Sequence, residues 1–181
     1  LLVFGCLSAA GFAAAPLLLP EPPNIYRTSI YDITLPKGWT CEIEVTESVC
    51  RPAGPPPYRA TMITSMKYRD RQMDTLDAYQ ARLEKPFNNA SRDGKPMVST
   101  VEHVGRTTID GRAWVDATHL DSEVRGYRTR YLGTVTVQVA ILMTFSSYRD
   151  DFQTYQPIFE RTVRSLNIYQ RYNGAAESEP G

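Results

Sequence analysis

The sequence contains few of the residues from which catalytic and metal sites are usually built. Its 181 residues include two histidines and three cysteines, and neither a Gly-x-Ser-x-Gly elbow nor a glycine-rich phosphate loop occurs. No histidine or Cys-x-x-Cys spacing accompanies Cys41 and Cys50, so a zinc or redox centre is not indicated. We therefore expect no catalytic constellation, no cofactor and no metal site.

An excess of charge of one sign is also missing. Twenty Lys and Arg residues balance twenty Asp and Glu residues, so the formal net charge is zero. A chain without a strong overall field is not drawn to nucleic acid or to an anionic membrane unless it has a local charged patch. With 42% apolar residues the chain can bury one core, and its length argues against two domains. We expect a single domain that does not bind nucleic acid.

Charge is completely absent from residues 1–15, which are apolar or small and end in three alanines. This pattern is typical of the apolar region and cleavage zone of a secretory signal, and a buried N-terminal helix is the alternative. Residues 16–27 are interpreted as a proline-rich leader. Attachment to a membrane would require lipidation of Cys6, which Phe4 disfavours because a small residue is expected there. The predicted location is therefore periplasmic or secreted.

Two cysteines remain after removal of such a signal, and an exported protein is exposed to oxidising conditions. If residues 41–45 and 46–50 form two short strands that fold back on each other, the thiols of Cys41 and Cys50 lie nearly opposite. We predict a disulfide between them.

Alternation of apolar and polar residues predicts strands over residues 30–35 and 58–68, with loops at 51–57 and 87–96. Asp110-Gly111 predicts a tight hairpin turn that pairs residues 99–109 with 112–121. In that register His119 faces Glu102, and His103 faces Thr118. A second hairpin is predicted at residues 132–135, with Gly133 in the turn and a return strand that reaches Phe145.

Two helices are expected. The first begins at the N-cap Asp74, presents Leu76, Tyr79 and Leu83 on one side and ends before Pro86. The second covers residues 150–168, with Asp150 or Asp151 as its cap. Pro157 requires either a place in the first turn or a kink. The predicted domain covers residues 28–168, and residues 169–181 form a polar tail expected to be disordered.

The two histidines and a basic, aromatic run are the remaining functional candidates. His103 and His119 are expected on opposite faces of the sheet, partly exposed, with Glu102 as the partner of His119. In the run at residues 125–131, Arg128 and Arg130 point one way and Tyr127 and Tyr131 the other. With Arg125, these four residues are the candidate partner-binding surface. The alternative is a solvated strand face whose arginines balance nearby acidic residues.

Several pieces of the chain resemble the PsbP-like family: residues 33–39 with Pro36-x-Gly38-Trp39, residues 75–79, residues 104–117, residues 155–159 and Ser165-Leu166. That family includes an extrinsic photosystem subunit, a Ran-binding import factor, DcrB-like bacterial envelope proteins and chaperone-like adaptors of secretion systems. The resemblance implies an α+β fold in which helices pack on a single antiparallel sheet, an α/β/α sandwich used for binding. The cysteine pair and the loop at 51–57 lie outside the common pattern, and no photosystem or Ran-contact motif is matched.

These observations together predict an exported, non-enzymatic binding or scaffolding protein of the cell envelope with a protein partner of unknown identity. An adaptor or chaperone for a secreted hydrophobic segment is one alternative, and a small envelope hydrolase is the other. An exposed apolar groove beside the sheet would favour the adaptor. A deep polar pocket enclosing His103 or His119 would favour the enzyme.

Overall fold

The computed structural model describes residues 21–90 and 94–169. The predicted signal peptide, Cys6 and all but the first residue of the predicted tail lie outside these ranges. In the described part of the chain, no helix is both long enough and apolar enough to cross a membrane.

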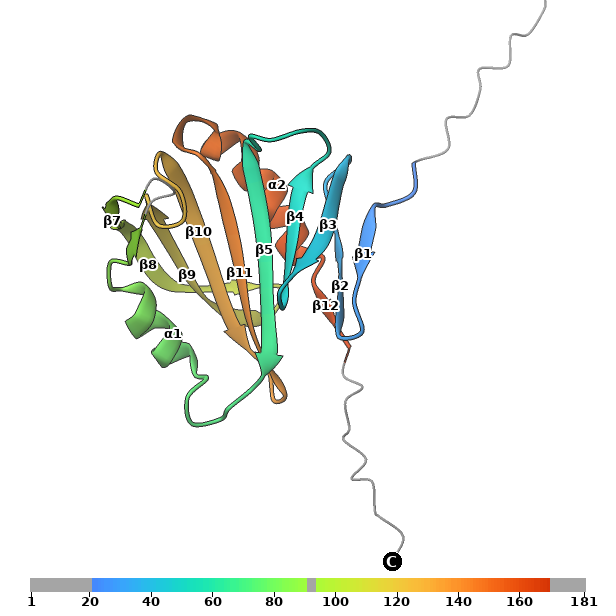
Figure 1. Cartoon of the computed structure of the whole chain (residues 1–181). Coiled ribbons are helices and arrows are strands. Elements are labelled where there is room, and N and C mark those ends of the chain that lie inside the picture. The colour runs from blue at the N-terminus through green and yellow to red at the C-terminus, as the bar shows by residue number, and fades with distance from the viewer. Residues whose placement is uncertain (1–20, 91–93, 170–181) are drawn as a thin grey trace, which may run out of the picture.

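A seven-stranded antiparallel sheet forms the centre of the molecule, with strand order β3-β4-β5-β11-β10-β9-β8 (Figure 1). Helix α1 packs on one face of this sheet and helix α2 on the other (Figure 1). The elements of the sheet and its helices are β3 (Trp39–Glu44), β4 (Glu47–Pro52), β5 (Ala60–Tyr68), α1 (Leu76–Leu83), β8 (Thr100–Ile109), β9 (Arg112–Leu120), β10 (Tyr127–Val135), β11 (Val139–Tyr148) and α2 (Phe152–Arg164).

The expectation of one sheet is only partly correct, because two smaller sheets accompany the large one. Strands β1 (Ile25–Arg27), β2 (Tyr31–Thr34) and β12 (Asn167–Ile168) form a three-stranded sheet. Strands β6 (Asn88–Ala90) and β7 (Pro96–Val98) form a two-stranded one in a segment predicted to be a loop. The stretch interpreted as a leader therefore ends in a strand, and Tyr169 is still hydrogen bonded to Ile30 beyond β12.

The two faces of the sheet carry separate cores. The larger core lies under α2 and includes Phe159 and Val163 of that helix with Met62, Met143 and Phe145 of the sheet. The smaller core lies under α1, where Leu76, Tyr79 and Leu83 cover Val115, Ala117 and Tyr131. Period-two alternation along β9, β10 and β11 supplies both cores from the same strands.

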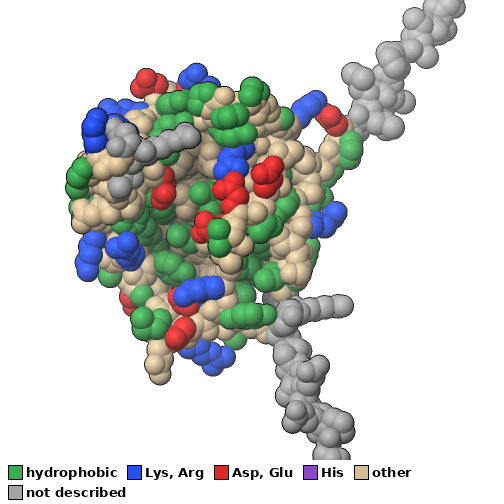
Figure 2. Space-filling view, viewed as in Figure 1, with side chains coloured by type: hydrophobic (Ala, Val, Ile, Leu, Met, Phe, Trp, Pro, Cys, Tyr) green, Lys and Arg blue, Asp and Glu red, His purple; other side chains and the backbone are tan. Residues whose placement is uncertain are grey.

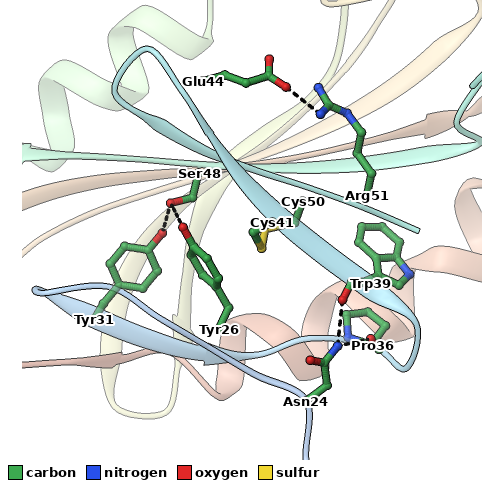
Figure 3. Close-up of a disulfide and its surroundings, with 10 residues drawn as sticks. All are labelled: Asn24, Tyr26, Tyr31, Pro36, Trp39, Cys41, Glu44, Ser48, Cys50 and Arg51. Carbon is green, nitrogen blue, oxygen red and sulfur yellow. Dashed lines mark hydrogen bonds and ion pairs between the residues drawn. A yellow bond between two sulfur atoms is a disulfide. The ribbon is translucent and has the colours of Figure 1, made fainter. Parts of the chain in front are cut away.

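The disulfide between Cys41 and Cys50 is present and joins β3 to β4 at directly opposite positions (Figure 3). Beside it, the hydroxyls of Tyr26 and Tyr31 both meet Ser48 Oγ, at 3.2 and 2.7 Å (Figure 3). The amide of Asn24 donates to the carbonyl oxygens of Pro36 and Trp39. These bonds fasten the small sheet to the edge of the large one.

The hairpin predicted from Asp110-Gly111 is confirmed. Both residues have positive φ, 47° for Asp110 and 74° for Gly111, and Ile109 pairs with Arg112. The predicted register holds as far as His103 opposite Thr118, and then a bulge at Glu102 shifts it. His119 therefore faces Val101 instead of Glu102.

Replacing Gly111 with valine should lower the free energy of unfolding by about 1–3 kcal/mol, because a β-branched residue is strained at positive φ. No atom lies within 4 Å of the site where a Cβ would stand, so backbone strain alone would cause the loss. Chemical denaturation of both proteins measures the difference. An unchanged unfolding midpoint would contradict the assignment of the turn.

The second hairpin was predicted at the wrong place. Gly133 lies inside β10, paired with Val115 and Leu142, and the chain turns at residues 136–138. Gly133 is required for close packing, since a Cβ there would lie 3.2 Å from Cγ of Tyr79 in α1. The buried alternation of the return strand holds from Val139 to Phe145, whereas Val137 is exposed.

The helix ends also differ from the predictions. Thr75, and not Asp74, caps α1 by accepting a hydrogen bond from the Ala78 amide at 3.0 Å. Asp74 is instead buried and forms an ion pair with Lys67. A short 3₁₀ turn, η1 (Arg149–Asp151), precedes α2, which ends at Arg164 because Asn167 and Ile168 form β12. Pro157 lies inside α2 beyond its first turn, and Asp151 bonds Arg59 without capping the helix.

Candidate binding groove

A groove of about 410 Å³ opens on the face of the sheet that carries α1 (Figure 2). Figure 2 shows a hollow with apolar side chains on its floor and acidic side chains beside it. Its volume lies within the range usual for ligand sites. The residues that line it are Glu47, Ile63, Ser65, Tyr79, Arg82, Leu83, Phe87, Asn89, Glu123, Tyr131, Leu142 and Thr144.

Three adjacent strands form the floor of the groove. Tyr131 of β10 pairs with Thr144 of β11, which pairs in turn with Ile63 of β5. Leu142 and Ser65 form the next row on the same face, two residues further along. Because side chains alternate across a strand, these five point to the α1 side while their neighbours enter the larger core.

Helix α1 covers only part of this face and so forms one wall. It packs mainly against β8, β9 and β10, so within the described residues no helix covers this face of β11, β5 and β4. The Tyr79 ring fits against Gly133 and brings the helix close to the sheet. The Arg82 guanidinium, in the last turn of α1, lies over the ring of Phe87, 4.7 Å from its centre.

Two carboxylates stand on different sides of the groove. Glu123, in the loop between β9 and β10, accepts a hydrogen bond of 2.6 Å from the buried hydroxyl of Tyr131. Burial, together with the charge of Glu123, raises the pKa of Tyr131, so this phenol remains a neutral donor. Glu47, on β4, accepts a hydrogen bond from Ser65 on the floor. Among the residues that the structure describes, no basic side chain forms an ion pair with either carboxylate.

The predicted partner-binding residues do not form one surface. Tyr127 and Tyr131 are buried, and only Tyr131 reaches the groove. Arg125 is exposed in the loop before β10. Arg128 and Arg130 do share a face, as expected, but it is the face that α2 covers.

Both arginines of that pair are occupied by acidic partners. Arg128 makes two hydrogen bonds with Glu102, at 2.7 and 2.9 Å, and Arg130 makes two with Asp116, at 2.9 and 2.6 Å. These four residues and His103 line a polar cleft of about 380 Å³ beside the start of α2. Charge reversal of the arginines would set like charges against Glu102 and Asp116, and so would disturb folding as well as binding.

His119 was expected to be partly exposed with Glu102 as its partner, and this expectation is wrong. Its side chain is fully buried, with Nε2 2.8 Å from the Leu83 carbonyl oxygen and Nδ1 3.1 Å from Ser99 Oγ. Its ring packs against Phe87 and Tyr131, directly behind the groove. His103 lies on the opposite face, as predicted. Within residues 21–90 and 94–169, no cluster of three or more His, Cys, Asp or Glu side chains could hold a metal ion.

Sequence reasoning missed most of the groove, including Glu47, Glu123 and Phe87. The groove residues come from five strands, two loops and one helix, so no local motif joins them. One signal was present in the sequence. Tyr131, Leu142 and Thr144 alternate with the buried residues of the larger core, which indicates that the opposite face of these strands also carries apolar side chains.

Comparison of the coordinates with solved structures establishes the class of fold as PsbP-like. The solution structure of cyanobacterial PsbP (CyanoP) from Synechocystis sp. PCC 6803 matches with a TM-score of 0.60 and 11% identity, over 87% of this chain and 98% of that one.

Two further structures share the fold. LpqN of Mycobacterium tuberculosis, described as involved in cell envelope biogenesis, matches with a TM-score of 0.51 and 12% identity, over 82% of this chain and 86% of that one. PA94 of Pseudomonas aeruginosa, a protein of unknown function described as a putative regulator, matches with a TM-score of 0.51 and 18% identity, over 81% of this chain and 97% of that one. No family model and no curated protein matches the sequence. At these identities the similarity defines the fold alone.

Proposed function

We propose that this chain is an exported, non-enzymatic binding protein of the cell envelope, and that it holds its ligand in the groove beside α1. The observation that carries the proposal is the groove itself, an apolar floor with hydrogen-bonding groups at its margins. Ligand sites have this composition, because apolar surface supplies affinity and a few polar groups fix orientation. The sheet supplies a rigid floor, and α1 supplies the wall.

Export is supported by two independent features of the chain. Residues 1–15 have the composition of a secretory signal. The Cys41–Cys50 disulfide fits an oxidising compartment. The structural similarity to an envelope protein agrees with this location.

The hydrogen bonds of the candidate catalytic side chains favour a binding role over the hydrolase alternative. Both ring nitrogens of His119 hold structural hydrogen bonds, and the ring does not line either the groove or the polar cleft. His103 does line the polar cleft, but its side chain is exposed at the surface and is not enclosed by it. Tyr131 is a neutral phenol fixed to Glu123. These groups position the wall and floor of the groove, and a general base would need a free nitrogen or oxygen within reach of a substrate.

Photo-crosslinking in the exporting cell tests the location of the binding site. A p-benzoylphenylalanine placed at Arg82 would stand on the groove wall, where its ring can pack on Phe87. The matched control carries the same probe at Gln153, which lines the polar cleft near α2. We expect specific adducts from position 82 only. Adducts only from position 153 would move the site to the arginine cleft, and adducts from neither would contradict a binding role for both.

A further inference from the structure

The margin of the groove is acidic, because carboxylates outnumber cationic side chains there among the residues that the structure describes. Glu47 and Glu123 line the groove, and Glu42 and Glu44 are exposed on the adjoining strand β3. The basic side chains in this region are Arg82, which stacks on Phe87, Arg51, which bonds Glu44 at 2.6 Å, and Lys67 of β5, which pairs with Asp74 at 2.8 Å. Among the described residues that line or adjoin the groove, five carboxylates thus face three cationic groups, since Lys67 and Asp74 neutralise each other. An occupant with positive charge would complement this margin.

The register of the β3–β4 hairpin also favours a positively charged occupant. Glu44 lies directly opposite Glu47, and like charges at such positions destabilise a strand pair. Arg51 neutralises Glu44, whereas among the described residues the partner of Glu47 is the uncharged hydroxyl of Ser65. A cation bound beside Glu47 would offset the repulsion between Glu44 and Glu47. Binding of the cation would therefore stabilise the hairpin.

The shape of the acidic margin favours a polypeptide over a small molecule. Glu42 and Glu44 continue the margin beyond the groove along an edge strand, two residues apart on one face of β3. Such positions are about 6.5–7 Å apart, which is also the spacing of alternate side chains in an extended segment. A segment that carries basic residues at alternate positions can therefore match successive carboxylates, whereas a single ammonium headgroup can meet only one end of the margin.

We propose that the occupant of the groove is an extended segment of a partner protein in which lysine or arginine side chains alternate with apolar ones. This inference rests on the proposed binding function and specifies the partner. The basic side chains at alternate positions point to the same face, so their aliphatic stems lie over Leu142, Ile63 and Leu83 while their charged ends meet Glu47 and Glu123 at the margins. The hydroxyl of Tyr131 holds Glu123 in place for this contact.

Defined peptides test the proposal directly. Acetyl-Leu-Lys-Leu-Lys-Leu-amide is titrated into the disulfide-bonded protein, and the methyl resonances of Leu83, Leu142 and Ile63 are followed by NMR. The same peptide with glutamine in place of lysine tests the charge, and hexylammonium tests a small cation of similar polarity. We expect saturable shifts of these methyl groups with the lysine peptide, and affinities at least about tenfold lower for the other two probes.

Single variants identify the carboxylates involved. Glu47→Gln and Glu123→Gln should each weaken binding of the lysine peptide about three- to tenfold and leave binding of the glutamine peptide unchanged. Asp150→Asn, which removes an exposed carboxylate at the start of α2, is the matched control and should have no effect. Wild-type-like spectra and cooperative unfolding in the absence of peptide show that the variants are folded.

Three outcomes would overturn the inference, and each leaves the binding function to be decided separately by the crosslinking experiment. Equal affinity for the lysine and glutamine peptides would show that charge plays no part. Binding of hexylammonium as tightly as the lysine peptide would show that the groove takes a small amine. Absence of shifts with all three probes, while a probe at Arg82 still gives adducts, would show that the groove binds a partner of different chemistry.

Discussion

Replacing Arg130 with methionine is expected to lower the free energy of unfolding by about 3–5 kcal/mol. The Arg130 side chain is 12% exposed and donates two hydrogen bonds to Asp116, whose side chain is 15% exposed. Its guanidinium also lies 3.3 Å from Glu160 of α2. Methionine can occupy much of the same space but supplies no charge. Asp116 would then remain as a nearly buried carboxylate without a partner, which costs more than the ion pair contributes.

Urea denaturation of the wild type and of the variant measures this loss. The matched control is Arg164→Met, because the ion pair of Arg164 with Asp110 is long, at 3.4 Å, and exposed on both sides. That change should alter stability by no more than about 0.5 kcal/mol. Adding Asp116→Asn to Arg130→Met should recover part of the loss, because the unpaired charge is removed. An Arg130→Met variant as stable as the control would contradict the role given to this pair.

Local signals in the sequence predicted the local structure well. Asp110-Gly111 specifies a turn because both residues accept positive φ, and the Cys41–Cys50 pair follows from a hairpin that is only ten residues long. The resemblance to the PsbP-like family was carried by such signals at both ends of the chain, and the fold agrees with it. Each of these predictions depends on residues close together in the sequence.

The errors arose where a distant element determines the local conformation. Gly133 looks like a turn residue, but it lacks a side chain because the Tyr79 ring of α1 occupies that space. The bulge at Glu102 shifts the register by one residue, and thereby places His119 opposite Val101 in a fully buried site. Neither the helix above β10 nor the bulge leaves a pattern in the neighbouring residues.

The candidate site was out of reach for the same reason. Arg128 and Arg130 stand out in the sequence, yet their acidic partners are 26 and 14 residues away along the chain. The groove is assembled from α1, five strands and two loops, and its carboxylates Glu47 and Glu123 lie far apart along the chain. The three-dimensional arrangement shows that the arginines have acidic partners, whereas among the described residues the two groove carboxylates form no ion pair.

Substitution of His119 by alanine should be a second strongly destabilising change, with a loss of about 3–5 kcal/mol at pH 8. The variant loses the packing of the ring on Phe87 and Tyr131 and leaves the Leu83 carbonyl oxygen without its donor. It also removes the acceptor of Ser99, whose hydroxyl accepts in turn from the Phe87 amide. Because Leu83 and Phe87 line the groove, the methyl resonances of Leu83 should broaden in the variant.

The same histidine should make the stability of the wild type fall in mild acid. The Leu83 carbonyl can only accept a hydrogen bond, so Nε2 carries the proton and Nδ1 accepts from Ser99. Burial lowers the pKa of His119, although the Leu83 carbonyl and the charges of Glu102 and Glu123 oppose this shift.

The folded state therefore binds this proton less readily than the unfolded state, whose histidine has a pKa of about 6.5. The contribution of His119 is complete above that pH and decreases as the pH falls toward the folded-state pKa.

Comparing the wild type with His119→Gln tests this direction of the pH dependence, because glutamine can donate to the Leu83 carbonyl oxygen but does not titrate. We expect the difference in unfolding free energy between the two proteins to be constant from pH 7.5 to 8.5. Below about pH 6.5 this difference should shrink steadily. A difference that stays constant down to pH 5, or grows in acid, would show that His119 does not lose stability by protonation. In that case its ring would be a purely structural support for the end of α1 and the wall of the groove.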